Sequence, residues 1–300
     1  GGGRCNFTNL GAGPQNFLSA NPHFAKSALA RYPARDFLAL VERYGIAWHE
    51  KTLGQLFCDG SAKQIVAMLL AECEKGAVEV RTGQDIGDVS RDEAGFAVAA
   101  NGETHRAPAL VIATGGPSIP KMGASGIAYD LARQFGLKVV EPRPALVPLT
   151  LGGEDVLFRE LSGVSAPVEA HAGKGKNTGR FREAALLTHK GLSGPAILQA
   201  SSYWRHGEAL RIDFLPDMPR GWLIERKGEN SKASLTGVLR EHLPERLADT
   251  LAGRLSLEGP LQGLSDKALQ AAEDRLRAWQ FHPNGTEGFA KAEVTAGGIS

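Results

Sequence analysis

Cysteine is scarce in this sequence, which has only Cys5, Cys58 and Cys73 among 300 residues. Three cysteines cannot build a disulfide framework, and no two of them form a CxxC pair. The sequence therefore gives no support for a dithiol relay or a zinc knuckle. It fits a protein of a reducing compartment, and we predict a cytoplasmic location.

Long apolar runs and an excess of charge of one sign are also missing. No run approaches the roughly 18 residues of a membrane span, and no leader pattern opens the chain. The formal net charge is +1, with 34 basic and 33 acidic residues scattered along the chain. We therefore predict a small-molecule substrate, no nucleic-acid partner and no membrane partner, and the oligomeric state stays open.

Motifs for metal or nucleophilic chemistry are absent as well. The eight histidines include no HxH or HExxH pair, so we predict no metal site. Ser193 lies in the string GLSGP, where Pro195 replaces the second glycine of a GxSxG nucleophile elbow, and a helix-entry role is the better interpretation. The lysine-rich loop 173–179 lacks P-loop spacing and predicts a hairpin. His189 can be structural or catalytic, and the catalytic residues stay unknown.

The apolar periodicity of the first hundred residues predicts short helices followed by strands. Residues 23–44 predict two helices broken near Pro33, and Ser61 is a suitable N-cap for a helix that ends at Gly76. A small antiparallel meander is predicted next. Its strands are expected at 78–82, 96–100 and 103–106, with a hairpin at Asn101-Gly102.

The run from Ala109 to Ala113 is apolar without alternation, which predicts a strand covered on both faces in an α/β sheet. Composition changes at 142–144 and 282–285 predict domain boundaries there. Further elements are expected as a helix over 126–135, strands over 145–151 and 210–214, a helix that Pro195 begins, and helices over 235–251 and 265–279.

Three glycine clusters stand out. Gly1 to Gly3 precede Arg4, and such a loop can turn backbone N–H groups and a guanidinium toward an anion. Thr114-Gly115-Gly116 follows the predicted buried strand, at the edge where α/β sheets bind ligands. Gly297-Gly298 repeats this arrangement. The alternatives are an ordinary glycine turn with a surface arginine and two tight strand exits.

The string GGGRCNFTN at residues 1–9 resembles the signature of the BaiN/YhiN-like NAD(P)/FAD-dependent oxidoreductases, also described as aminoacetone oxidase family FAD-binding enzymes. Further blocks agree in the same order along nearly the whole chain. They are GQLFC at 54–58, PALVPL at 144–149, THKGLSGPAILQA at 188–200, and GTEG at 285–288 leading to AEVT at 292–295.

This resemblance implies an α/β fold in which a Rossmann-like FAD-binding domain with a β-meander is interrupted by an inserted α+β domain. The segments are then 1–141 for the first part of the FAD-binding domain, 142–282 for the inserted substrate-side domain and 283–300 for the return segment. The residues that it implies for FAD binding are Gly2, Gly3, Arg4, Cys5, Asn6, Ile86, Thr114, Gly115, Gly116, Gly297, Gly298 and Ile299.

The resemblance also implies a function. FAD would pass hydride from a reduced nicotinamide, NAD(P)H, or an organic substrate to an acceptor such as an unsaturated ketone or dioxygen. A flavin amine oxidase using dioxygen and a non-catalytic flavin-binding module are the alternatives. The GxGxxG unit and a flavin-closing segment of the family have no counterpart in these 300 residues, so we expect the chain by itself to bind FAD weakly and to be inactive.

Overall fold

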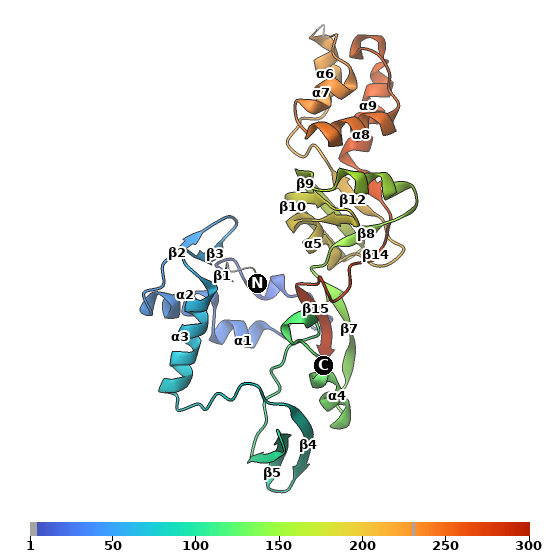
Figure 1. The fold of residues 1–300 in the computed structure, drawn as a ribbon. Helices are drawn as coiled ribbons and strands as arrows, with labels where there is room; N and C mark the ends of the chain where they lie inside the picture. Colours follow the sequence, from blue (N-terminus) through green and yellow to red (C-terminus); the bar gives the residue numbers. More distant parts are fainter. Residues whose placement is uncertain (1–4, 230–231) are drawn as a thin grey trace. The chain divides into compact units, whose positions relative to one another are not determined.

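The computed structural model describes residues 5–229 and 232–300, and it divides into two compact units, residues 1–107 and residues 108–300 (Figure 1). Both units mix helices and antiparallel sheets. Among the described residues, no helix is both long and apolar enough to cross a bilayer.

The first unit opens with a three-stranded sheet and short helices. Its elements are β1 (Asn6–Asn9), η1 (Pro14–Asn16), α1 (Lys26–Arg31), α2 (Ala34–Arg43), β2 (Trp48–Glu50), β3 (Gln55–Cys58) and α3 (Ala62–Lys75), with strand order β1-β3-β2. Ser61 caps α3 in a capping box with Gln64, as the sequence predicts, and Gly76 ends the helix. Pro33 separates α1 from α2, which confirms the predicted break.

The meander completes the first unit with β4 (Ile86–Asp92), β5 (Gly95–Ala100) and β6 (Glu103–Ala107). Asn101 and Gly102 both have positive φ, 49° and 83°, so the predicted hairpin is confirmed. The predicted first strand over 78–82 is wrong. Val78 and Val80 are 56% and 50% exposed, because the chain there has no strand beside it and pairing begins only at Ile86.

The predicted buried strand over 109–113 is also wrong. These residues form no strand, and Val111 is 83% exposed. An apolar strand of this kind needs neighbours that pair its backbone on both edges and cover both its faces. Within the described residues no strand pairs with this run, so its apolar side chains have no sheet to join.

The second unit contains a two-stranded sheet that joins distant parts of the chain. Strand β7 (Val139–Ala145) pairs antiparallel with β15 (Val294–Ile299). Helix α4 (Ile127–Gln134) packs against both strands and confirms the helix predicted over 126–135, and η2 (Pro120–Met122) precedes it in the chain.

A seven-stranded antiparallel sheet forms the centre of the second unit, with strand order β13-β12-β9-β10-β11-β8-β14. Its strands are β8 (Leu149–Leu151), β9 (Ser165–Lys174), β10 (Asn177–Leu187), β11 (Gly191–Ser193), β12 (Leu210–Asp213), β13 (Trp279–Phe281) and β14 (Pro283–Thr286). The end strands β13 and β14 are separated in the chain by His282 alone. The sheet therefore curls until its two edges meet at that residue, and the buried Asp155 accepts the N–H of His282 there at 2.8 Å.

Helices cover and extend this curled sheet (Figure 1). They are η3 (Gly153–Leu161), α5 (Pro195–Ser201), α6 (Trp222–Gly228), α7 (Leu235–Arg240), α8 (Glu245–Leu255), η4 (Leu261–Gly263) and α9 (Asp266–Arg277). Pro195 is the first residue of α5, as predicted, and this helix packs on β9 and β10. The core centres on Phe158, whose ring meets those of Phe281 and Trp279 edge to face at 4.8 and 5.9 Å between centroids.

The domain boundaries proposed at 142 and 282 stay a prediction. Strand β14, in the predicted return segment, pairs with β8 of the predicted inserted domain.

Candidate functional site

Within the second unit, the Thr114-Gly115-Gly116 loop lies against β15. A Cβ on Gly116 would come within 2.5 Å of the Thr295 side chain and 2.7 Å of the Tyr129 hydroxyl. Ser118 Oγ and Thr295 Oγ1 are 2.8 Å apart, which joins the loop to the strand. The structure thus brings together two of the three glycine clusters, and close packing explains why Gly116 must be glycine.

The Gly297-Gly298 cluster forms a bulge in the β7–β15 pair. The register shifts between Ala296 and Gly298, and Gly297 has φ +88°. A Cβ on Gly297 would lie 2.5 Å from the carbonyl oxygen of Glu141. Only glycine meets both conditions. Ile299 pairs with Val139 next to the bulge and is 39% exposed.

The loop presents free backbone donors. Gly115 has φ +71° with open space where a Cβ would stand, and Thr114 and Gly115 are exposed. In the described part of the chain, no hydrogen bond involves the amide N–H of Gly115 or of Gly116. Exposed amides without protein partners can donate to a phosphate or to a ring carbonyl. The loop therefore fits a group such as FAD, which carries both.

The other predicted residues belong to the first unit or to the undescribed start. Gly2, Gly3 and Arg4 lie outside the described residues. Cys5 accepts the backbone N–H of Cys58 at 3.2 Å. The side-chain amide of Asn6, oriented to satisfy its partners, donates to the carbonyls of Thr8 and Leu56 at 2.9 and 3.2 Å. Ile86 begins β4 opposite Ala100 and is 43% exposed.

The structure places two cysteines side by side that no sequence motif joins. Burial raises the pKa of the Cys58 thiol, and the neighbouring Cys5 raises it further. Both are free thiols in the same apolar cluster. The 52 residues between them hide this pairing in the sequence, and only the β1–β3 register reveals it.

The glycines of the GLSGP string at 191–195 have a structural explanation. Gly194 has φ +88°, and a Cβ there would lie 2.7 Å from the carbonyl oxygen of Ala184. The carbonyl of His189 accepts a hydrogen bond from Arg159 Nε at 2.7 Å. Ser193 ends β11 just before α5, as expected of a helix-entry residue. Among the described residues, no three His, Cys, Asp or Glu side chains gather as metal ligands.

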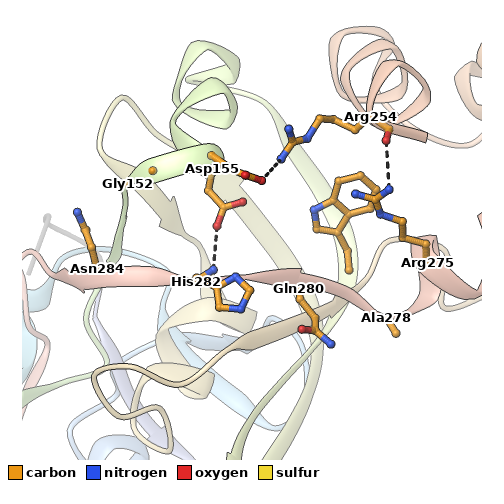
Figure 2. Close-up of a pocket in the computed structure, with 11 residues that line it drawn as sticks. Gly152, Asp155, Arg254, Arg275, Ala278, Gln280, His282 and Asn284 are labelled. Carbon is orange, nitrogen blue, oxygen red and sulfur yellow. Dashed lines mark hydrogen bonds and ion pairs between the residues drawn. The ribbon is translucent and has the colours of Figure 1, made fainter. Parts of the chain in front are cut away.

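A cavity of about 630 Å³ opens where the two edges of the curled sheet meet (Figure 2). Arg275 lies 5.0 Å from the Trp279 ring centre and donates to the carbonyl of Arg254 at 3.2 Å, while Arg254 is 3.7 Å from Glu154. Its lining residues are Gly152, Gly153, Glu154, Asp155, Arg254, Arg275, Ala278, Trp279, Gln280, His282 and Asn284. None of them belongs to the residues predicted to bind FAD.

A row of polar side chains crosses the outer face of the seven-stranded sheet. The register pairs Gln280 with Arg211, Arg211 with His171, and His171 with Arg180. Alternate residues on the same strands, such as Ile212 and Ala170, are fully buried, so the row lies on the opposite, solvent side. His171 Nε2 is 2.9 Å from the Thr178 hydroxyl, also on this side.

The cations of this row act on His171. Burial lowers the pKa of its imidazole below the usual 6.5, and Arg211 and Arg180 lower it further, against Glu169, which raises it. We expect Arg211→Gln to raise the His171 pKa in an NMR titration of the ring protons, because one cation that opposes the imidazolium is removed. Lys267→Gln on α9 is the control and should leave that pKa in place. An unchanged pKa in Arg211→Gln would show that Arg211 does not act on the ring.

The sign of the pH dependence follows. Since the pKa is lower in the folded state, the unfolded chain binds the proton more readily, and His171 reduces stability as the pH falls below about 6.5. In His171→Gln this part of the acid destabilisation should disappear.

Comparison with known proteins identifies the family. Residues 1–300 match the family described as "HI0933-like protein Rossmann domain". The chain belongs to this family. The resemblance drawn from residues 1–9 is thereby confirmed at the level of a Rossmann-type flavoprotein family, and the mixed helix and sheet are consistent with the predicted α/β class. Membership implies an FAD-binding protein, whereas NAD(P)H as co-substrate stays a prediction.

Three similar proteins carry enzyme names. A "Ribosomal RNA dihydrouridine synthase" of Escherichia coli (strain K12) is 50% identical over 308 residues, covering 100% of this chain and 75% of the relative. A protein of the same name from Haemophilus influenzae is 41% identical over 305 residues, with 100% and 75% covered. The "3-dehydro-bile acid delta(4,6)-reductase" of Clostridium scindens is 28% identical over 327 residues, with 100% and 76% covered.

These names correct one prediction. The absence of a nucleic-acid partner was inferred from a net charge of +1 and from scattered basic residues. It is wrong, because two family members that align with the whole chain carry the name of an enzyme of ribosomal RNA. Net charge reports only the sum over the chain, and cations gathered by strand pairing do not appear in it.

Proposed function

We propose that this protein is an FAD-dependent reductase that converts a uridine of RNA to dihydrouridine. The observation that carries the proposal is the shared name of two relatives that are 50% and 41% identical over the whole chain. We further propose that NAD(P)H supplies the hydride and that the reaction takes place in the cytoplasm.

The two kinds of named relative have a common chemistry. The C5=C6 bond of uracil is conjugated with the C4 carbonyl, and the bile-acid relative's name describes reduction of double bonds beside a 3-oxo group. For uracil, hydride adds to C6, the carbon farther from the C4 carbonyl, and a proton adds to C5, the carbon beside it. When bound, FAD supplies the hydride-transfer chemistry.

The protein's own residues hold and orient the cofactor in this proposal. The free amides of Gly115 and Gly116 donate to its oxygen atoms, and the Ser118–Thr295 hydrogen bond fixes the loop that carries them. The residues proposed to line FAD remain those inferred from the family resemblance, including Cys5, Asn6, Ile86, Thr114 and the glycine bulge of β15.

The test is a nucleoside analysis. The chain is joined to the GxGxxG unit and the flavin-closing segment that the family resemblance calls for, because these 300 residues alone are expected to bind FAD weakly. It is then reconstituted with FAD and incubated with NADPH or NADH and a transcript of ribosomal RNA, and the digested RNA is examined by mass spectrometry. We expect a uridine that has gained two hydrogens, and none with FAD and NADPH alone. Intact uridine under all these conditions would contradict the proposal.

A second candidate is the reduction of a small conjugated ketone, which the bile-acid relative favours. Turnover of a 3-oxo steroid diene, with RNA left unchanged, would support it. Reduction of the flavin by aminoacetone but not by NADPH would instead indicate an amine oxidase.

A further inference from the structure

We propose that the outer face of the seven-stranded sheet is a docking surface for the phosphate backbone of RNA, with Arg180 and Arg211 as its phosphate contacts. The proposal rests on RNA being the substrate, as argued above. It identifies the part of the chain that holds the RNA.

The first support is geometry. Neighbouring strands lie about 4.8 Å apart, so Arg180 and Arg211, two strands apart, have backbones separated by about 10 Å, and the row from Gln280 to Arg180 spans about 14 Å. Such a row crosses the strands and offers donors to several points along one strand of RNA. The Arg180 side chain is 69% exposed, and Arg211 and Gln280 are exposed too.

The second support is charge. Within residues 5–229 and 232–300, neither Arg211 nor Lys176, at the turn between β9 and β10, forms an ion pair, and so both charges are available. Arg180 pairs with Glu169 at 3.1 Å, and its side chain is 69% exposed against 23% for that carboxylate.

Other acids on this face are already matched. Arg182 pairs with Asp217. Burial raises the pKa of Asp213, whose carboxylate lies 3.8 Å from Arg277. Among the described residues of the row, Arg211 therefore has no ion-pair partner, and Arg180 is the more exposed member of its ion pair, so both guanidiniums can donate to a polyanion.

Arginine on an open sheet suits phosphate in particular. The planar guanidinium donates two parallel hydrogen bonds to phosphate oxygens. Contacts of this type position a nucleic acid without reading its sequence, and they leave the reacting base free to enter a separate site. Gln280 also lines the cavity of Figure 2.

The experiment is a binding measurement on the whole chain. A fluorescein-labelled, uridine-containing hairpin RNA is titrated with the unmodified protein, with Arg180→Gln/Arg211→Gln, and with Arg220→Gln/Lys267→Gln. The control pair removes the same charge from exposed positions away from the row that have no ion pair among the described residues. Thermal unfolding of all three proteins verifies that each variant is folded.

We expect the Arg180→Gln/Arg211→Gln protein, the row variant, to bind RNA about tenfold more weakly near 0.15 M salt. The slope of log K against log salt should become shallower by about 1.4, because two single-strand phosphate contacts are lost. The control variant should match the unmodified protein within about twofold. These two results together would support the docking surface.

Three outcomes would overturn it: equal weakening in both variants, no RNA binding by the unmodified chain in low salt, or binding of polyglutamate as tight as that of RNA. The nucleoside analysis decides the proposed function separately. If the protein forms dihydrouridine and its row variant binds RNA normally, the proposed docking surface is wrong and the proposed reaction is still supported.

Discussion

Replacing Phe158 by alanine is expected to lower the free energy of unfolding of residues 108–300 by about 3–5 kcal/mol, the range for a large aromatic residue deleted from a packed core. Phe158 is fully buried and joins the ring cluster of Trp279 and Phe281 at the junction of the sheet edges. Its removal leaves a cavity beside Trp279 and Phe281, where β13 and β14 join at His282 and Asp155 accepts the N–H of that residue.

Urea unfolding followed by tryptophan fluorescence measures this change, because Trp279 lies beside Phe158 and reports on the cluster. The matched control is Val156→Ala on the same short helix. Val156 is 43% exposed, so this substitution should change stability by less than about 0.5 kcal/mol. A Phe158→Ala protein within about 1 kcal/mol of the original would show that the ring cluster is not the core of this unit.

Gly297→Ala should lower the free energy of unfolding by about 3 kcal/mol, and Gly115→Ala should lower it by about 1 kcal/mol. Both residues have positive φ, +88° and +71°, and an alanine in that region costs about 1–2 kcal/mol. The two differ in their surroundings. A Cβ at Gly297 meets the Glu141 carbonyl oxygen at 2.5 Å, whereas at Gly115 nothing lies within 4 Å.

The difference in the free energy of unfolding between the two variants measures the cost of displacing the β7 backbone at the bulge. It can be followed by thermal unfolding, and by hydrogen exchange of the β7 and β15 amides, which should be faster in Gly297→Ala alone. Equal losses in both variants would mean that the bulge tolerates a side chain and that only backbone conformation matters at these glycines.

Local signals in the sequence were reliable where the deciding contacts lie within a few residues. Ser61 caps its helix with a partner three residues away, Asn101-Gly102 turns a hairpin, and Pro195 begins α5. In each case, short-range hydrogen bonds or a fixed φ set the conformation. The family signature at residues 1–9 was equally local, and it led to the correct flavoprotein family.

Signals that depend on a distant partner were less reliable. The apolar run 109–113 predicted a buried strand, yet a strand exists only where another strand pairs with it, and no described segment does so. The proximity of Cys5 to Cys58 also went unpredicted, because it requires the relative placement of segments far apart in the chain. The meeting of the Gly116 loop with the β15 segment was expected from the family resemblance and from no local pattern.

The sequence by itself determined the caps, the turns and the family to which the chain belongs. The tertiary structure alone decided which side chains meet. His171, Arg180 and Arg211 come from three strands and share one row only because antiparallel register aligns them and strand alternation turns them to the same face. A shift of one residue in that register would turn each of them into the core.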